Sequence, residues 1–150
     1  LKEKKLTFDA LVRPQHLENL LIFARKHHDL PIVIDHIAKP KILNNEIEKW
    51  KIDMKNISKL DNIYCKYSGI LTEVGKNYSK DQIKPYIEFI FEIFDSKKLM
   101  WGSDWPVLTM ADNYQTWFDL SQEFIKNISE DEKMNIYCNT ATKFYSMSEI

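Results

Sequence analysis

Apolar residues along the chain fall into short continuous runs separated by stripes at helical spacing. The runs are rich in β-forming residues and predict four strands, at residues 6–12, 31–35, 62–67 and 98–101. The second run is apolar nearly throughout, as expected for a strand covered on both faces. Pro14 ends the first run because proline offers no donor to a strand ladder.

Between these runs, apolar side chains recur every three or four residues, which predicts amphipathic helices. The stripes comprise Leu17, Leu20, Leu21 and Ala24; Ile47, Trp50, Met54 and Ile57; Ile83, Ile87, Ile90, Phe91 and Phe94; and Trp117, Leu120, Ser121, Phe124 and Ile128. Capping boxes are predicted where Ser79 precedes Gln82 and Ser129 precedes Glu132. Asn139 is expected to begin the last helix.

The order of elements is four consecutive β-then-α units and a helical tail. Strands that alternate with helices imply parallel strands joined by right-handed crossovers. The strand starts are roughly 25–35 residues apart, which suits a barrel or a doubly wound sheet equally. No internal linker or repeat divides the sequence, so residues 1–150 are expected to form one domain.

Composition excludes several functions. With 21 basic and 22 acidic side chains, we expect no nucleic-acid partner and no anionic-membrane partner. No apolar run approaches the ~20 residues of a membrane span, and no signal peptide is expected from the charged opening at Leu1, which reads as mid-protein sequence. Cys65 and Cys138 fit no CxxC motif, so a reduced, cytoplasmic protein is expected. Three glycines provide no phosphate-binding loop.

Polar side chains follow each predicted strand, where parallel α/β folds place their chemistry. They are Arg13 and His16; Asp35, His36 and Lys39; Lys66, Ser68 and Glu73; and Ser103, Asp104 and Trp105. Each also has a structural interpretation. His36 could be a hydrogen-bonded packing residue, Asp104 a turn former, and Lys66 the partner of a carboxylate. The coincidence of His36, Lys66 and Asp104 at successive strand ends favours the functional interpretation.

Four sequence blocks carry a resemblance to a known family. They are Phe8-Asp-Ala-Leu-Val-Arg-Pro14, Ile32-Val-Ile-Asp-His-Ile-Ala-Lys-Pro40, Ile63-Tyr-Cys-Lys-Tyr-Ser-Gly69 and Leu99-Met-Trp-Gly-Ser-Asp-Trp-Pro106. In this order they resemble the C-terminal half of the amidohydrolase-related family that includes L-fucono-lactonases and the 2-pyrone-4,6-dicarboxylate lactonase. The tail Asn139-Thr-Ala-Thr-Lys-Phe-Tyr145 also resembles that family's last helix.

This resemblance implies an α/β fold of the (β/α)₈ TIM-barrel type, with the four strands as the fifth to eighth and the N-terminal half absent. The family's first strand ends in a His-x-His pair, whereas the histidines of this sequence are His16, His27, His28 and His36. A gene fragment, a truncated chain or a split gene would each explain that departure.

The family pattern also implies roles for individual residues. Asp104 corresponds to the acid that acts as general base toward the hydrolytic water, and His36 to the histidine that polarises the substrate carbonyl or binds a metal. Arg13, Lys39, Lys66 and Trp105 lie where substrate contacts are expected. His36 and Asp104 are the candidate metal ligands, and we expect one divalent ion, zinc or manganese, or none.

The expected function is therefore hydrolysis of a sugar lactone or similar small cyclic ester by the complete protein, with this chain alone inactive. The chemistry is coherent, because an ionised aspartate can accept a proton from water and a histidine can assist the carbonyl. Two alternatives remain open: a catalytically silent half-barrel that associates with another chain, and a related metal-dependent decarboxylase. The partner is expected to be a small-molecule substrate.

Overall fold

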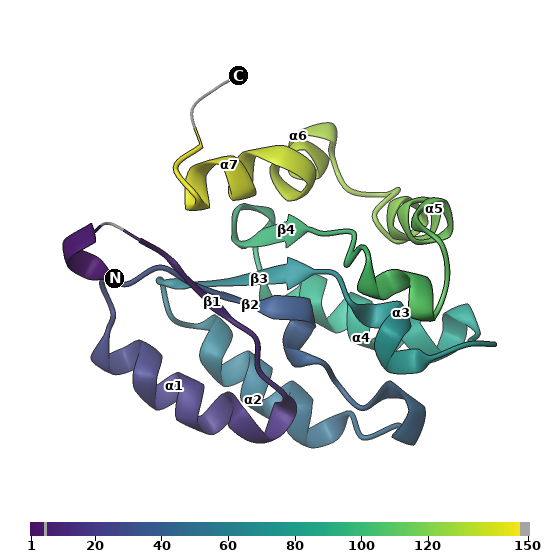
Figure 1. Ribbon diagram of the computed structural model, residues 1–150, viewed down its shortest axis with the longest axis horizontal. Helices are drawn as coiled ribbons and strands as arrows, with labels where there is room; N and C mark the ends of the chain where they lie inside the picture. The colour runs from purple at the N-terminus through teal and green to yellow at the C-terminus, as the bar shows by residue number, and fades with distance from the viewer. Residues whose placement is uncertain (5, 148–150) are drawn as a thin grey trace.

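A computed structural model describes residues 1–4 and 6–147 of the chain, and its centre is a four-stranded sheet (Figure 1). The strands are β1 (Phe8–Ala10), β2 (Ile32–Ile34), β3 (Ile63–Tyr67) and β4 (Leu99–Trp101). All neighbouring pairs are parallel, and their order in the sheet is that of the sequence. The four predicted strands are thereby confirmed, each shorter than the apolar run that predicted it.

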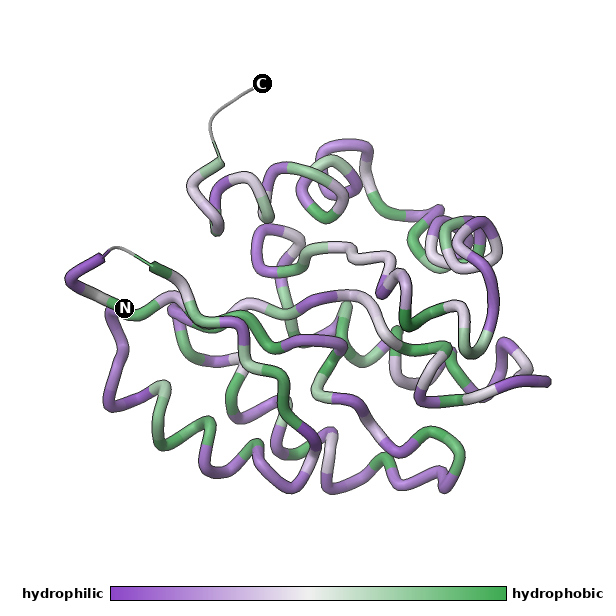
Figure 2. The backbone as a smooth tube through the Cα atoms, viewed as in Figure 1, coloured by the Kyte–Doolittle hydropathy of each residue, from purple (hydrophilic) through white to green (hydrophobic). Residues whose placement is uncertain are grey.

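Helices connect the strands and extend beyond the last one. They are α1 (Leu17–Lys26), α2 (Glu48–Ser58), α3 (Ile70–Val74), α4 (Lys80–Ile93), α5 (Tyr114–Phe124), α6 (Glu130–Met134) and α7 (Thr140–Phe144). Along α1 and α2 the backbone alternates between hydrophobic and hydrophilic residues (Figure 2), as expected for helices with one buried face. None of the helices within the described residues has the length and apolar character that a bilayer crossing requires.

Helix boundaries show where local sequence was informative. The capping boxes at Ser79 and Ser129 are both present. Asn139 is the N-cap residue of α7, as predicted, but its backbone is already helical, because a π-helical turn (Asn135–Asn139) runs on into α7. Helix α5 starts before the predicted stripe, because the Asn113 side chain accepts a hydrogen bond from the Thr116 amide and caps it.

The two faces of the sheet are covered differently. Alternate strand residues such as Ile34, Cys65 and Leu99 belong to the large core shared with the helices. The intervening residues Val33 and Met100 face the other way and form a smaller cluster with Phe144 of α7. Strands β2, β3 and β4 therefore contribute to two cores, which explains why β2 is buried at all three positions.

The C-terminal segment crosses this second face of the sheet. The Tyr145 hydroxyl donates a 2.7 Å hydrogen bond to Asp9 Oδ2 in β1, and the Phe144 ring packs edge-on against Tyr64 with centroids 4.8 Å apart. In Figure 1 the sheet accordingly lies between α1 and α2 on one side and α6 and α7 on the other.

Candidate active site

His36 and Asp104 follow the carboxyl ends of β2 and β4, and both have unusual backbone conformations. Residues 36–39 all lie in the left-handed region, with φ between 47° and 62°, and Asp104 has φ 59°. None of these residues is glycine, so each conformation is strained. Trp50 stabilises the turn at residues 36–39, because its Nε1 donates a 2.9 Å hydrogen bond to the Ile37 carbonyl.

The two side chains meet across the end of β3. His36 Nε2 lies 3.6 Å from Asp104 Oδ1, and the Asp104 side chain is only 5% exposed. On the far side of the imidazole, Nδ1 lies 2.8 Å from Ser68 Oγ. On the far side of the carboxylate, Thr72 Oγ1 donates to Asp104 Oδ2 at 3.2 Å. The result is a continuous polar array from Ser68 to Thr72.

Burial determines the charge of His36. Desolvation lowers its pKa below the ordinary value, and this outweighs the carboxylates of Asp104 and Asp35, which raise the pKa. The ammonium groups of Lys39 and Lys66 lower it further. His36 is therefore neutral at neutral pH, and a neutral imidazole can donate one hydrogen bond or ligate a metal, but it supplies no full positive charge.

Lys66 lies in β3 and is held by two carboxylates. Its Nζ is 2.6 Å from Asp9 Oδ2 and 2.7 Å from Asp35 Oδ1. Burial opposes its charge, but the hydrogen bonds to Asp35 and Asp9 raise the pKa of Lys66 above the ordinary value. The Tyr145 hydroxyl joins the cluster, and burial together with the bond to Asp9 raises its pKa to about 12. The Lys66 ammonium is therefore already paired with the carboxylates of Asp9 and Asp35.

Arg13 and Lys39 share a single carboxylate. Lys39 Nζ lies 3.1 Å from Glu73 Oε1, and an Arg13 guanidinium nitrogen lies 3.7 Å from Glu73 Oε2. The Glu73 side chain is 14% exposed, whereas that of Arg13 is 54% exposed. Arg13 is thus free to turn toward a solute, while Lys39 is the more firmly held of the two.

Trp105 lies on the surface beside Asp104. Its side chain is mostly solvent-exposed at 66%, and its backbone amide donates to Ser103 Oγ at 3.2 Å. The following Trp105–Pro106 peptide bond is cis. An exposed aromatic ring next to the buried carboxylate is available for contact with a ligand.

His36 and Asp104 meet part of what a divalent metal ion requires of its ligands. The 3.6 Å separation of His36 Nε2 and Asp104 Oδ1 suits two neighbouring ligands, each about 2.1 Å from one tetrahedral ion. A catalytic zinc site takes three protein ligands. Among the described residues no cluster of three or more histidine, cysteine or acidic side chains could hold a metal. These residues therefore fit a metal in part and do not form its site alone.

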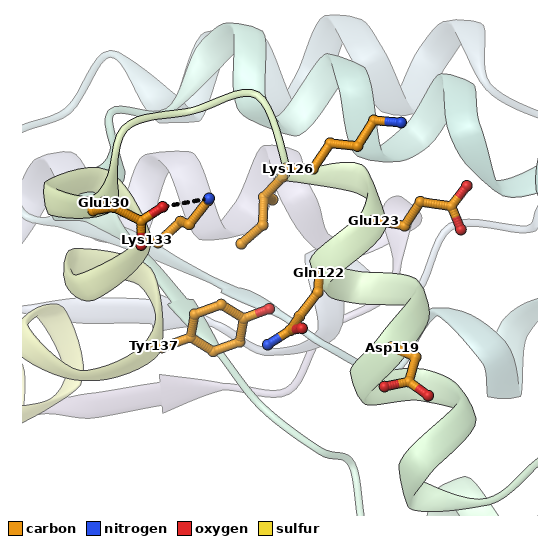
Figure 3. A pocket seen from close by; sticks show the side chains of 8 residues that line it. Asp119, Gln122, Glu123, Lys126, Glu130, Lys133 and Tyr137 are labelled. Atoms are coloured by element: carbon orange, nitrogen blue, oxygen red, sulfur yellow. Dashed lines mark hydrogen bonds and ion pairs between the residues drawn. The ribbon is translucent and has the colours of Figure 1, made fainter.

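A surface pocket lies away from the strand-end cluster. A pocket of about 530 Å³ between α5 and α6 is lined by Asp119, Gln122, Glu123, Ile125, Lys126, Glu130, Lys133 and Tyr137 (Figure 3). Its charges are mixed, and Lys133 is paired with Glu130 at 2.7 Å. None of the predicted site residues lines it.

The sequence interpretation missed Thr72. This residue lies in α3, a helix too short for apolar periodicity to reveal. A signal was present all the same, because Thr72 closely follows Ser68-Gly69, at which β3 was predicted to end. Residues soon after a strand end are candidates for the same edge of the sheet.

The fold and this strand-end cluster define a class of hydrolase barrels. The amidohydrolase family matches residues 1–147, and the chain belongs to that family. A solved amidohydrolase from Burkholderia multivorans with bound zinc superposes with a TM-score of 0.92 at 25% identity, covering 99% of this chain and 55% of that one. The fold is therefore that of half a (β/α)₈ barrel.

One further relative is a lactonase by name, and another carries the name of a hydrolase. An L-fucono-1,5-lactonase from Burkholderia ambifaria is 37% identical over 144 residues, which cover 93% of this chain and 50% of the relative. The structure of a 2-pyrone-4,6-dicarboxylic acid hydrolase from Pseudomonas putida superposes with a TM-score of 0.79 at 17% identity, over 99% of this chain and 54% of that one, and shows the shared fold. The chain spans about half the length of the curated relatives it matches.

Proposed function

We propose that this chain supplies His36 and Asp104 to the active site of an enzyme that hydrolyses a sugar lactone or a similar small cyclic ester. The observation that carries the proposal is the 3.6 Å approach of these two side chains at the strand ends. The 37% identity to an L-fucono-1,5-lactonase, over nearly the whole chain, supports the substrate class.

In the proposed reaction Asp104 is the general base. It accepts a proton from the water whose oxygen attacks the lactone carbonyl carbon. The ring C–O bond then breaks, and the departing alkoxide takes up the proton that Asp104 removed from the water, which gives the open hydroxy acid and restores the Asp104 carboxylate. Neutral His36 donates from a ring nitrogen to the carbonyl oxygen as negative charge develops there. Because this hydrogen bond strengthens in the transition state, it favours turnover more than binding.

Cations near the site suit a substrate that becomes an acid. We assign Arg13 to the carboxylate of the opened product, because its guanidinium is largely exposed and only loosely paired with Glu73. Lys39, Lys66 and Trp105 are assigned to substrate contacts beside it. Lys66 is the most constrained of these, since Asp9 and Asp35 already bind its ammonium.

One divalent ion, zinc or manganese, or none, is proposed for the complete site, and a bound ion would supply Lewis-acid activation of water or carbonyl. His36 and Asp104 would be its ligands in this chain. A His36 nitrogen that ligates the ion carries no proton, so the hydrogen bond from His36 to the carbonyl oxygen belongs to the metal-free site. The zinc bound to the Burkholderia multivorans amidohydrolase supports metal dependence. We also propose a cytoplasmic location, since both cysteines are free thiols.

Asp104→Asn tests the proposal in the longer protein that contains this chain. Asparagine tolerates the left-handed φ of 59° and still forms turns, but it lacks the basic oxygen. With a panel of aldono-lactones near neutral pH, kcat should fall roughly 10²–10⁴-fold. KM should change far less, because the base acts on water in the transition state.

Asp112→Asn is the matched control, because Asp112 lies in the same connection and binds the Tyr78 hydroxyl. It should leave kcat close to that of the parent. An Asp104→Asn protein within about threefold of the parent on kcat would make Asp104 a turn residue and would remove the proposed mechanism.

A further inference from the structure

A single segment, residues 68–72, which follows β3 and includes the first turn of α3, contacts both candidate catalytic side chains. Ser68 Oγ lies 2.8 Å from His36 Nδ1, and Thr72 Oγ1 lies 3.2 Å from Asp104 Oδ2. In the sheet β3 lies between β2, which precedes His36, and β4, which precedes Asp104. The segment that leaves β3 can therefore reach both neighbours at once.

Gly69 lets this segment pass directly against the imidazole. Its φ is +66°, and a Cβ atom placed there would lie 2.5 Å from His36 Cβ and 2.6 Å from His36 Nδ1. Real Cβ atoms do not approach so closely, and a left-handed φ is itself unfavourable for other residues. The His36 ring is thus fixed between the Ser68 hydroxyl and the Gly69 backbone.

The neighbours of His36 determine where its proton lies. Ser68 is 1% exposed, and within the described residues its hydroxyl has His36 Nδ1 as its one hydrogen-bond partner. A buried hydroxyl hydrogen without an acceptor is costly, so Ser68 donates to Nδ1. In the metal-free protein a neutral imidazole then carries its proton on Nε2, facing Asp104 Oδ1. The other tautomer would direct a lone pair at the carboxylate.

Thr72 restrains the carboxylate from the opposite side. Its hydroxyl has two acceptors within reach, the Gly69 carbonyl at 2.9 Å and Asp104 Oδ2 at 3.2 Å. A hydroxyl has one hydrogen, and an ionised carboxylate is the stronger acceptor. The contact also returns to the segment that holds His36, so one stretch of backbone sets the relative position of the two side chains.

We propose that residues 68–72 form a positioning segment, in which Ser68 fixes the ring of His36, with the proton on Nε2 in the metal-free protein, and Thr72 fixes the carboxylate of Asp104. The inference rests on the proposed function for its catalytic meaning. Its structural content is tested without any turnover. Ser68 and Thr72 act through the two catalytic groups and need no contact with the substrate.

Nitrogen-15 NMR of the imidazoles tests the role of Ser68. In metal-free protein the His36 signals, identified by their loss in His36→Gln, should show a protonated Nε2 and an unprotonated Nδ1. Ser68→Ala should produce a mixture of tautomers. Ser121→Ala, which removes an equally buried serine hydroxyl bonded to Trp101, should leave the His36 signals unchanged. A proton on Nδ1 in the parent, or an unaltered His36 spectrum in Ser68→Ala, would overturn this role.

Crystal structures of two Thr72 variants test the second role. Thr72→Val keeps the shape and removes the hydroxyl, so the Asp104 carboxylate should rotate away from its present position. Thr72→Ser keeps the hydroxyl and should retain that position. Thr140→Val is the control, because the Thr140 hydroxyl donates to the Ser96 carbonyl. An unmoved Asp104 in Thr72→Val would refute the role of Thr72.

Kinetics of the longer protein separate this inference from the proposed function. Thr72→Val should lower kcat roughly 10–100-fold with KM nearly unchanged, the usual effect of losing such a supporting contact, and Thr72→Ser should restore it. Equal kcat in Thr72→Val and parent would overturn the positioning role. If the parent hydrolyses no lactone, the proposed function fails, while the spectra and crystal structures still decide whether residues 68–72 position the two side chains.

Discussion

The least favourable backbone conformations of this protein are concentrated in the residues that its chemistry would use. His36, Ile37, Ala38, Lys39 and Asp104 all have positive φ without being glycine. Each costs roughly 1–2 kcal/mol, and Ile37 is β-branched, which makes its conformation rarer still. Such strain persists only where surrounding contacts fix the residue, and it gathers at functional sites. Contacts with the surrounding structure therefore hold residues 36–39 and Asp104 in these backbone conformations.

Gly69 is where that packing is tightest, and Gly69→Ala tests it. The new Cβ would overlap the His36 ring and meet a strained φ, so we expect the free energy of unfolding to fall by roughly 2–5 kcal/mol. Gly75→Ala is the comparison variant. Gly75 also has a positive φ, but a Cβ atom there would contact only Leu43, at an ordinary 3.9 Å. Urea denaturation should show the larger loss for Gly69→Ala, and equal losses would mean that contact with His36 is unimportant.

The two cysteines should react very differently with thiol reagents. Cys65 is buried in the core, and desolvation raises the pKa of its thiol well above the ordinary value. Cys138 is exposed. Because the thiolate is the reactive species, a colorimetric titration of the native chain at pH 8 should detect one thiol, and the same titration in denaturant two. Cys138→Ser should abolish the native signal; rapid reaction of that variant would contradict the buried position of Cys65.

At the scale of elements, the helix after each functional strand end secures the turn that precedes it. Trp50 of α2 donates from Nε1 to the Ile37 carbonyl, beside His36. Trp117 of α5 donates from Nε1 to the Gly102 carbonyl, two residues before Asp104. Both indoles are 1% exposed and both bonds are 2.9 Å long. A hydrogen bond from a buried indole to a backbone carbonyl thus supports the turn on each side of the candidate site.

Replacing either tryptophan by phenylalanine should weaken the fold and loosen its turn. Trp50→Phe and Trp117→Phe each leave a carbonyl without its donor, so the free energy of unfolding should fall by roughly 1–3 kcal/mol. Trp105→Phe is the control, since that side chain is largely exposed. Thermal unfolding of the three variants provides the measurement. A Trp105→Phe protein as destabilised as the other two would show that the indole hydrogen bonds are not the cause.

There is a physical reason why the sequence predicts some elements and not others. Strands buried on both faces need continuous apolar runs, and long helices need repeated stripes, so β2 and α4 were recognisable. Helix α3 spans five residues, too few for a period to emerge. The left-handed turn after β2 contains no glycine that would signal positive φ. Local sequence therefore predicts the long elements and omits the short ones that shape the site.

The candidate site could likewise be predicted only in part. His36 and Asp104 could be selected because residues after parallel strands share one edge of the sheet, and the structure brings these two side chains together. The partners of the cations could not be predicted. Lys66 binds Asp9, and Arg13 binds Glu73, through contacts between residues far apart in the sequence. The catalytic and binding roles themselves remain predictions.

At the scale of the whole molecule, the described residues form a sheet with two outer strands. β1 pairs with β2, and β4 pairs with β3, while β1 and β4 do not pair with each other. Four strands cannot close an eight-stranded barrel. The cluster at the strand ends is consequently bounded on one side by this sheet, and the described residues provide two candidate metal ligands where a catalytic zinc needs three.

The purified 150-residue chain should therefore show no lactone turnover above background. His36 and Asp104 are present, but the sequence contains no His-x-His pair, and the half barrel does not enclose a substrate. Exclusion of water and fixed orientation of the carbonyl provide much of the rate acceleration in such sites, and an open sheet provides neither. Aldono-lactone hydrolysis near neutral pH should match buffer alone and should match the Asp104→Asn chain. Turnover that exceeds background and disappears in Asp104→Asn would show that these four strands form a self-sufficient active site.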